Sequence, residues 1–189
     1  MQDAQDHKHC VGIVLAGGRS RRMGRDKALL ECGGISLLRH QVDCLTQACA
    51  QVAVSGDYPG FDCVPDIHPD GGPLAGMHAA AKRFPGNALL FLAIDTPAMT
   101  PQALRQLQTQ GVPCHYHAQP LPCHLPDAVR LADVIEAIWA AGGKPSVQAL
   151  HRELASRVLP VADSALFENL NTPAQWQAFR SKGKADKDI

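Results

Sequence analysis

The chain has 189 residues, of which 46% are hydrophobic and 19% are charged, and it carries no formal net charge. This length suits one well-packed domain and is short for two, and the composition is that of an ordinary globular protein. A neutral balance lacks the footprint of a general nucleic-acid binder, and no run approaches the ~20 apolar residues that span a bilayer. We therefore expect one domain over residues 1–189, with flexible ends at 1–10 and 181–189.

The first residues and the cysteines bear on where the protein works. The opening segment, MQDAQDHKHC, is polar and contains acids, unlike a secretory signal. The seven cysteines are an odd number at scattered spacings, which fits reduced thiols better than a disulfide framework. We expect a cytoplasmic protein that engages neither a membrane nor a nucleic acid.

Short apolar runs alternate along the chain with segments of helical periodicity. The expected strands lie at 11–15, 51–55, 61–65, 88–94 and 158–161. The expected helices lie at 37–48, 73–84, 101–110, 131–141, 146–155 and from Thr172 onward. Residues 111–126, rich in Pro, His and Cys, fit neither pattern. The alternation predicts an α/β fold, a single doubly wound and mainly parallel sheet with helices on both faces.

Four candidate residues lie where such a fold binds its ligands. Gly17, Ser55, Asp66 and Asp95 each stand at or just beyond the end of an expected strand. Ligands of doubly wound folds bind in a crevice outside the carboxyl ends of the strands. The sequence therefore predicts one ligand site at this edge of the sheet.

Residues 13–30, IVLAGGRSRRMGRDKALL, are the most informative stretch. Here an apolar run meets two glycines and then five cations, Arg19, Arg21, Arg22, Arg25 and Lys27. Glycines let backbone N–H groups turn inward, and flanking cations suit a polyanion such as a triphosphate. The stretch is not a Walker A loop, because Gly18 stands where that motif needs Lys, and Gly-x-Gly-x-x-Gly does not occur around Gly17.

The stretch does match the pattern Leu-Ala-Gly-Gly-x-Ser-x-Arg-Met-Gly-x-Asp-Lys-Ala-Leu, at residues 15–29. This pattern strongly resembles the signature of the nucleotidyltransferases that make molybdenum cofactor dinucleotides, the molybdenum cofactor guanylyltransferases. Three later segments resemble landmarks of that family in the same order: GPLAGM at 72–77, FLAIDTP at 91–97 and NLNTP at 169–173. The likeness covers roughly residues 11–180 and implies a Rossmann-like nucleotidyltransferase fold.

The resemblance implies transfer of GMP from GTP to the molybdopterin cofactor, with release of pyrophosphate and with Mg²⁺ as cofactor. It also implies transient contacts with molybdopterin-synthesis proteins and apo-molybdoenzymes. The catalytic residues that it implies are Lys27, Arg22 and Asp95. The implied nucleotide-binding residues are Leu15, Ala16, Gly17, Gly18, Lys27, Ser55, Asp66, Gly76 and Asp95. The implied metal ligands are Asp95, whose carboxylate suits a hard ion, and Asn171.

The chain departs from the family pattern in two places. Ser55 stands where the family commonly has Asn, and a hydroxyl offers less of an edge for reading a base than an amide does. The family uses residues 111–126 to approach the pterin, and here only Gln119-Pro120-Leu121 is recognisable. The pterin contacts therefore stay open.

Three alternatives remain. A cytidylyltransferase would act on the same pterin, but such relatives usually read Leu-Ala-Ala-Gly, so Gly17 favours guanine. A non-catalytic carrier would keep the basic loop and could dispense with Asp95. A zinc site would use Cys114, His117 and the adjacent Cys123 and His124, which are poorly spaced to share one ion.

Cysteine or serine nucleophiles are not favoured. No Gly-x-Ser-x-Gly elbow occurs, and Cys32, Cys44 and Cys49 fall in or near expected apolar helix faces. We expect these cysteines to be small core residues.

Overall fold

The computed structural model of the chain describes residues 10–17, 26–32, 34–68, 71–142, 145–170, 175 and 179. The strands are β1 (Cys10–Leu15), β2 (Glu31–Cys32), β3 (Ile35–Ser36), β4 (Gln51–Ser55), β5 (Cys63–Val64), β6 (Ala88–Ala93), β7 (Cys114–Tyr116), β8 (Gln119–Leu125) and β9 (Arg157–Leu159). The α-helices are α2 (Leu37–Thr46), α3 (Pro73–Arg83), α4 (Pro101–Gln108), α5 (Ala128–Ala140) and α6 (Val147–Glu153). Two 3₁₀ helices are η2 (Lys27–Leu29) and η3 (Ser164–Phe167). The helix expected from Thr172 onward begins outside the described residues.

Seven strands form the main sheet in the order β5-β4-β1-β6-β8-β7-β9. The pairs β5/β4, β4/β1, β1/β6 and β7/β9 are parallel, and only β8 runs against its neighbours. The chain moves from β1 to one side, through β4 and β5, and then returns to β6 on the other side of β1. The expectation of a mainly parallel, doubly wound sheet is confirmed.

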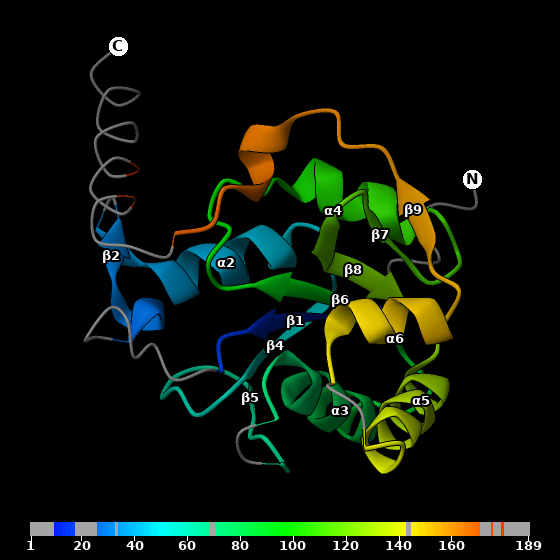
Figure 1. The fold of residues 1–189 in the computed structure, drawn as a ribbon. Helices are drawn as coiled ribbons and strands as arrows, with labels where there is room; N and C mark the ends of the chain where they lie inside the picture. The colour runs from blue at the N-terminus through cyan, green and yellow to red at the C-terminus, as the bar shows by residue number, and fades with distance from the viewer. Residues whose placement is uncertain are drawn as a thin grey trace.

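Helices cover both faces of this sheet (Figure 1). Helices α2 and α4 pack on one face, and α3, α5 and α6 pack on the other. Along β6, Leu90 and Leu92 join the first core while Leu89 and Phe91 join the second. Because both faces of β6 are buried, its sequence reads as an unbroken apolar run instead of an alternating one.

The segment 111–126 forms a hairpin of β7 and β8 that completes the sheet beyond β6. The turn passes through Ala118, which adopts the left-handed conformation with φ 57°. Two prolines within β8, Pro120 and Pro122, obscure its strand pattern, since proline lacks the N–H of a ladder donor. The resulting strand inserts antiparallel between β6 and β7.

Local side chains fix where most of the helices begin. The N-caps with side-chain hydrogen bonds to the helix backbone are Ser36 of α2, Thr100 of α4, Asp127 of α5 and Ser146 of α6. Helix α3 differs, because its N-cap is Gly72, which has φ 62° and no side chain with which to cap. Gly72 therefore provides no side-chain acceptor for the backbone N–H groups in the first turn of α3.

Candidate active site

Three strand ends meet at one edge of the sheet. Leu15, the last residue of β1, is level with Ser55 at the end of β4 and with Ala93 at the end of β6. The Ile94 N–H then donates to the Leu15 carbonyl at 3.2 Å, which holds the two chain exits side by side. The segments that follow β1 and β6 therefore leave the sheet together, at the point where the strand order reverses.

Lys27 and Asp95 face each other across this edge. The Lys27 Nζ lies 3.6 Å from Asp95 Oδ2, and their side chains are 14% and 26% exposed. Lys27 begins η2, which Asp26 caps by accepting from the Ala28 N–H at 2.9 Å. Because Ala28 is fully buried, the short helix is anchored to the core. The pair joins a cation at the start of η2 to a carboxylate in the turn after β6.

Side chains from α2 hold the turn that carries Asp95. Gln41, fully buried, donates through Nε2 to the Ala93 carbonyl at 2.9 Å and to the Thr96 carbonyl at 3.1 Å. His40 Nε2 lies 2.9 Å from the Pro97 carbonyl. Sequence reasoning missed both residues. The available signal was a glutamine on the apolar face of a helix, where a buried amide needs partners.

The carboxyl-terminal motif reaches the same turn. The Leu170 N–H donates to the Asp95 carbonyl at 2.8 Å, so the chain just before Asn171 is bonded to the residue that we expect to bind metal. Asn171 itself lies outside the described residues, as do Gly18 and Arg22. The expected roles of these three residues stay predictions.

Ser55 and Asp66 form a second polar pair beside Gly17. Ser55 is buried, and its Oγ donates to Asp66 Oδ1 at 3.1 Å. A Cβ at Gly17 would lie 3.4 Å from Asp66 Oδ2, so this glycine leaves the second carboxylate oxygen uncovered. Asp66 is exposed, so the Ser55 hydroxyl orients a carboxylate that opens onto the site.

Gly76 lies in α3 and lets the helix approach the end of β4. A Cβ at Gly76 would overlap Ser55 Oγ and would lie 3.0 Å from Ser55 Cβ. Gly76 is buried, so close packing of helix and strand accounts for its lack of a side chain. The same contact brings the first turn of α3 towards Ser55, and helix N-termini favour anions.

A divalent metal fits this edge if it arrives with phosphates. Among the described residues, no group of three His, Cys, Asp or Glu side chains could hold a metal ion by itself. Mg²⁺ commonly keeps its waters and binds through one or two carboxylates plus substrate phosphates. The partly exposed carboxylate of Asp95 suits that kind of site.

The family model described as the MobA-like NTP transferase domain matches residues 12–158. The chain belongs to this family. A relative in Xanthomonas euvesicatoria, named molybdenum cofactor guanylyltransferase, is 38% identical over 174 residues, or 88% of this chain and 92% of the relative. A relative in Mycobacterium bovis, named probable molybdenum cofactor guanylyltransferase, is 34% identical over 96% of this chain and 98% of its own length.

Solved structures share the fold of this MobA-like chain. Molybdopterin-guanine dinucleotide biosynthesis protein A from Archaeoglobus fulgidus has a TM-score of 0.77 at 22% identity, over 93% of this chain and 99% of that protein. A 2-C-methyl-D-erythritol 4-phosphate cytidylyltransferase from Thermus thermophilus has a TM-score of 0.68 at 13% identity, over 94% and 99% of the two chains. At such identities the likeness establishes the fold alone.

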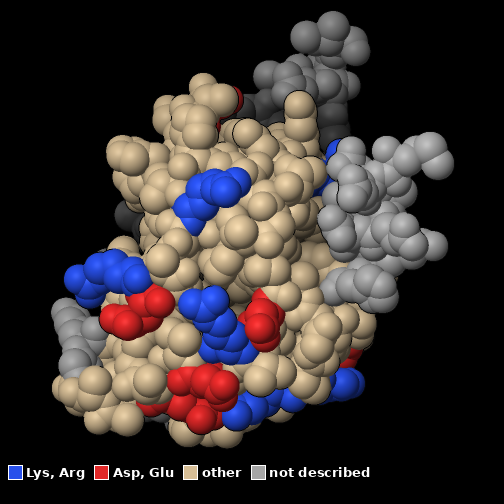
Figure 2. Space-filling model, turned by 90° about the vertical axis from the view of Figure 1, so that its right-hand side faces the viewer, with Lys and Arg blue, Asp and Glu red and all other residues tan. Residues whose placement is uncertain are grey.

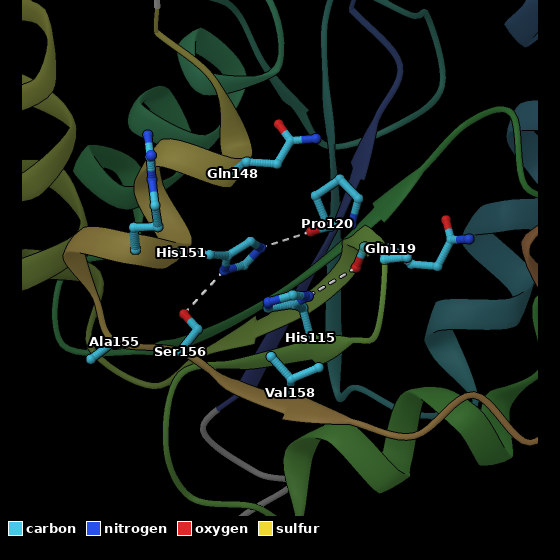
Figure 3. A pocket seen from close by; sticks show the side chains of 10 residues that line it. His115, Gln119, Pro120, Gln148, His151, Ala155, Ser156 and Val158 are labelled. Carbon is cyan, nitrogen blue, oxygen red and sulfur yellow. Dashed lines mark hydrogen bonds between the residues drawn. The ribbon is translucent and has the colours of Figure 1, made fainter.

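A separate cavity of about 360 Å³ opens beside the β7–β8 hairpin and α6 (Figure 3). His115 and His151 stack there with ring centroids 4.0 Å apart. His151 donates from Nε2 to the Pro120 carbonyl at 2.9 Å and accepts at Nδ1 from the Ser156 hydroxyl at 3.0 Å. Burial, and after it the charge of His115, lowers the pKa of His151 to about 4, so its ring is neutral at pH 7.

Cys and His residues of the β7–β8 hairpin lie opposite one another on its paired strands. Cys114 pairs with His124 and His115 pairs with Cys123 across the ladder, and both cysteines are fully buried. Burial raises the pKa of both thiols, Cys114 to about 11, which disfavours the thiolate that zinc requires. In the part of the chain that the structure describes, these residues form no metal cluster.

The surface shown in Figure 2 carries mixed charge. Basic and acidic side chains lie interspersed over that face. On α3 and α5, Lys82 Nζ and Glu136 Oε1 lie 2.7 Å apart as an ion pair. The described side chains on this face therefore form no single basic patch of the kind that binds nucleic acids. Within the described ranges, no helix has both the length and the apolar character needed to span a bilayer.

Proposed function

We propose that the chain transfers GMP from GTP to the terminal phosphate of the molybdopterin cofactor and releases pyrophosphate. The observation that carries the proposal is the Lys27–Asp95 pair at the meeting point of β1 and β6, 3.6 Å apart. Relatives that match the chain over nearly their whole length are named molybdenum cofactor guanylyltransferases, which supports this choice of donor and acceptor.

The reaction asks for positioning and charge neutralisation more than for a strong base. An oxygen of the acceptor phosphate forms a bond to the α-phosphorus of GTP, and the bond from that phosphorus to the bridging oxygen breaks. Because a phosphate monoester is already anionic, its oxygen needs no deprotonation before attack. Catalysis then depends on holding donor and acceptor in line and on stabilising the leaving pyrophosphate.

Lys27 binds the β- and γ-phosphates in this proposal and stabilises the pyrophosphate as it leaves. The backbone N–H groups after β1 and in the first turn of α3 supply further donors. A Mg²⁺ ion held by Asp95 would neutralise charge on the phosphates when bound. In the absence of phosphates the Lys27 ammonium compensates the Asp95 carboxylate, so neither charge is left alone at the edge.

Asp66 is our candidate for reading guanine. The Watson–Crick edge of guanine presents two adjacent donors, the N1–H and the 2-amino group, and a carboxylate is an acceptor for both. Cytosine presents one donor beside two acceptors and does not match. The Ser55 hydroxyl, which donates to Asp66 Oδ1 at 3.1 Å, fixes that carboxylate and gives Ser55 a role where the family commonly has Asn.

We place the reaction in the cytoplasm. The cysteines at positions 10, 44, 49, 63, 114 and 123 are free thiols, which supports a reducing compartment.

The direct test is product analysis with the purified chain, Mg²⁺, GTP and molybdopterin cofactor. We expect mass spectrometry to detect the guanine dinucleotide form of the cofactor, with one pyrophosphate for each product. GTP binding without any product would contradict the transferase proposal and favour the carrier.

A further inference from the structure

Tyr58, in the loop between β4 and β5, contacts the residues on either side of the segment that links β1 to η2. Its hydroxyl lies 3.2 Å from the carbonyl oxygen of Ala16, just after β1. The same hydroxyl lies 3.1 Å from Oδ2 of Asp26, just before η2. Both partners are acceptors, so the phenol O–H donates to one of them or is shared between the two. One side chain thus joins the exit of β1 to the entry of the helix that carries Lys27.

Asp26 uses both of its carboxylate oxygens in this arrangement. Oδ1 accepts from the Ala28 N–H at 2.9 Å and caps η2, while Oδ2 faces Tyr58. Lys27 is the first residue of that helix and reaches Asp95. The orientation of Lys27 at the site therefore depends on a carboxylate whose second oxygen is held by Tyr58.

The loop after β4 is built to present this tyrosine. Gly56 has φ 136°, and a Cβ there would stand 2.6 Å from Tyr58 Cε2, so only glycine admits the ring in this position. The Cys63 thiol accepts from the Tyr58 N–H at 3.2 Å and donates to the Tyr58 carbonyl at the same distance. Backbone and ring of Tyr58 are thus both fixed from β5 and from the end of β4.

We propose that Tyr58 is a positioning residue that sets Lys27 for the triphosphate by holding Asp26 and Ala16. The inference rests on the proposed function, because it assigns Lys27 to the phosphates of GTP. Burial, followed by the charge of Asp26, raises the pKa of Tyr58. The hydroxyl consequently remains a donor across the pH range in which the enzyme would be assayed.

The test replaces Tyr58 by phenylalanine, which keeps the ring and removes the donor. We expect Tyr58→Phe to lower kcat/KM for GTP about tenfold, mainly through a higher KM, with the melting temperature little changed. The matched control is Tyr116→Phe, since the Tyr116 hydroxyl donates to the Ala103 carbonyl at 2.8 Å, in the core between β7 and α4. We expect this control to lower stability and to leave kcat/KM unchanged.

A double-mutant cycle tests whether Tyr58 acts through Asp26. Serine keeps the capping bond to Ala28 but cannot reach Tyr58, so Asp26→Ser removes the carboxylate and its contact with Tyr58 while the cap of η2 is retained. On that background, we expect Tyr58→Phe to change kcat/KM by no more than about twofold. Two outcomes would overturn the proposal. One is that Tyr58→Phe lowers kcat/KM by the same factor in the Asp26→Ser background as in the wild type. The other is that Tyr58→Phe and Tyr116→Phe lower kcat/KM equally.

Equilibrium binding separates this inference from the proposed function. Titration with a fluorescent GTP analogue measures the effect of Tyr58→Phe without any transfer reaction, and we expect weaker binding by the variant. If the wild-type chain binds GTP but forms no product, the proposed transfer fails while the role of Tyr58 in binding is still measured. If the wild type forms product and Tyr58→Phe matches it in binding and in KM, the positioning role alone is wrong.

Discussion

The ammonium of Lys27 and the carboxylate of Asp95 lie 3.6 Å apart, although one follows a glycine loop and the other lies in the turn after the buried strand β6. The pairing of β1 with β6 creates this proximity, because it places Leu15 level with Ala93. One side chain suits phosphate oxygens and the other suits a cation that accompanies them. The pair is therefore the chemical centre of the proposed transfer.

Replacing Asp95 by asparagine tests the catalytic part of this account. We expect Asp95→Asn to lower kcat by roughly 10²-fold or more while GTP binding stays within about tenfold of wild type, because the lost charge acts mainly during transfer. Asp133→Asn, an exposed acid on α5, is the control and should keep full activity. Pyrophosphate release and GTP titration give the two quantities, and full activity of Asp95→Asn would remove Asp95 from the mechanism.

Base selectivity tests the role of Asp66. We expect Asp66→Asn to lose roughly 10- to 100-fold in kcat/KM for GTP, as expected for hydrogen bonds to a charged group. Its preference for GTP over ITP, which lacks the 2-amino group, should shrink towards one. Ser55→Ala keeps the carboxylate without its orienting hydroxyl, so its loss should be smaller. If the GTP/ITP ratio is unchanged but the ratio of GTP to 2′-deoxyGTP falls, Asp66 contacts the ribose instead of the base.

Gly76 and Ser55 should behave as a coupled pair. In an unobstructed helix, Gly→Ala stabilises by up to ~1 kcal/mol. Here the new methyl group would meet Ser55 Oγ, so we expect Gly76→Ala to lower the free energy of unfolding by ~1–3 kcal/mol. Adding Ser55→Gly removes the obstruction and should recover most of that loss. Urea denaturation measures all three variants, and a stabilising Gly76→Ala would contradict the packing described above.

His151 predicts a loss of stability in mild acid. Its pKa in the folded chain is about 4, whereas histidine in an unfolded chain titrates near 6.5. Between these values the unfolded chain binds more protons, so stability is full above about pH 6.5 and falls as the pH approaches 4. The shift corresponds to at most about 3 kcal/mol.

The measurement is the free energy of unfolding of wild type and His151→Asn at pH 7.5 and pH 4.5. We expect the wild type to be the more stable at pH 7.5 and its advantage to shrink at pH 4.5. His117→Asn, at an exposed histidine in the turn between β7 and β8, is the control variant. A His151→Asn variant that keeps the wild-type pH dependence would show that another group carries the effect.

The strand ends that form this edge of the sheet could be predicted from the sequence. The strands that end at Leu15 and Ala93 are almost unbroken apolar runs, and the strand that ends at Ser55 contains the apolar run Val52-Ala53-Val54. Such runs are recognisable without any knowledge of the tertiary fold. Since parallel strands in this fold class place their ligands at the carboxyl ends, the residues that follow these strands could be proposed together. The structure brings Lys27 to Asp95 and Ser55 to Asp66.

Other features could not be read from local pattern. The β7–β8 hairpin was obscured because Pro120 and Pro122 interrupt the pattern of β8. Gln41 and Tyr58 act through partners far away in the sequence, at Ala93 and Asp26, so neither shows a local motif. In the sequence, Ser55 shows only as a departure from the family pattern, whereas the structure shows its hydroxyl donating to Asp66 Oδ1.

Pyrophosphate release with GTP, CTP and ATP, each offered separately with Mg²⁺ and molybdopterin cofactor, tests the central claim most directly. The account predicts release with GTP alone, and its loss in Asp95→Asn. Release with CTP in preference to GTP would retain the transfer chemistry and contradict the assignment of guanine. No release with any of the three nucleotides, from a chain that binds GTP, would contradict the transferase itself.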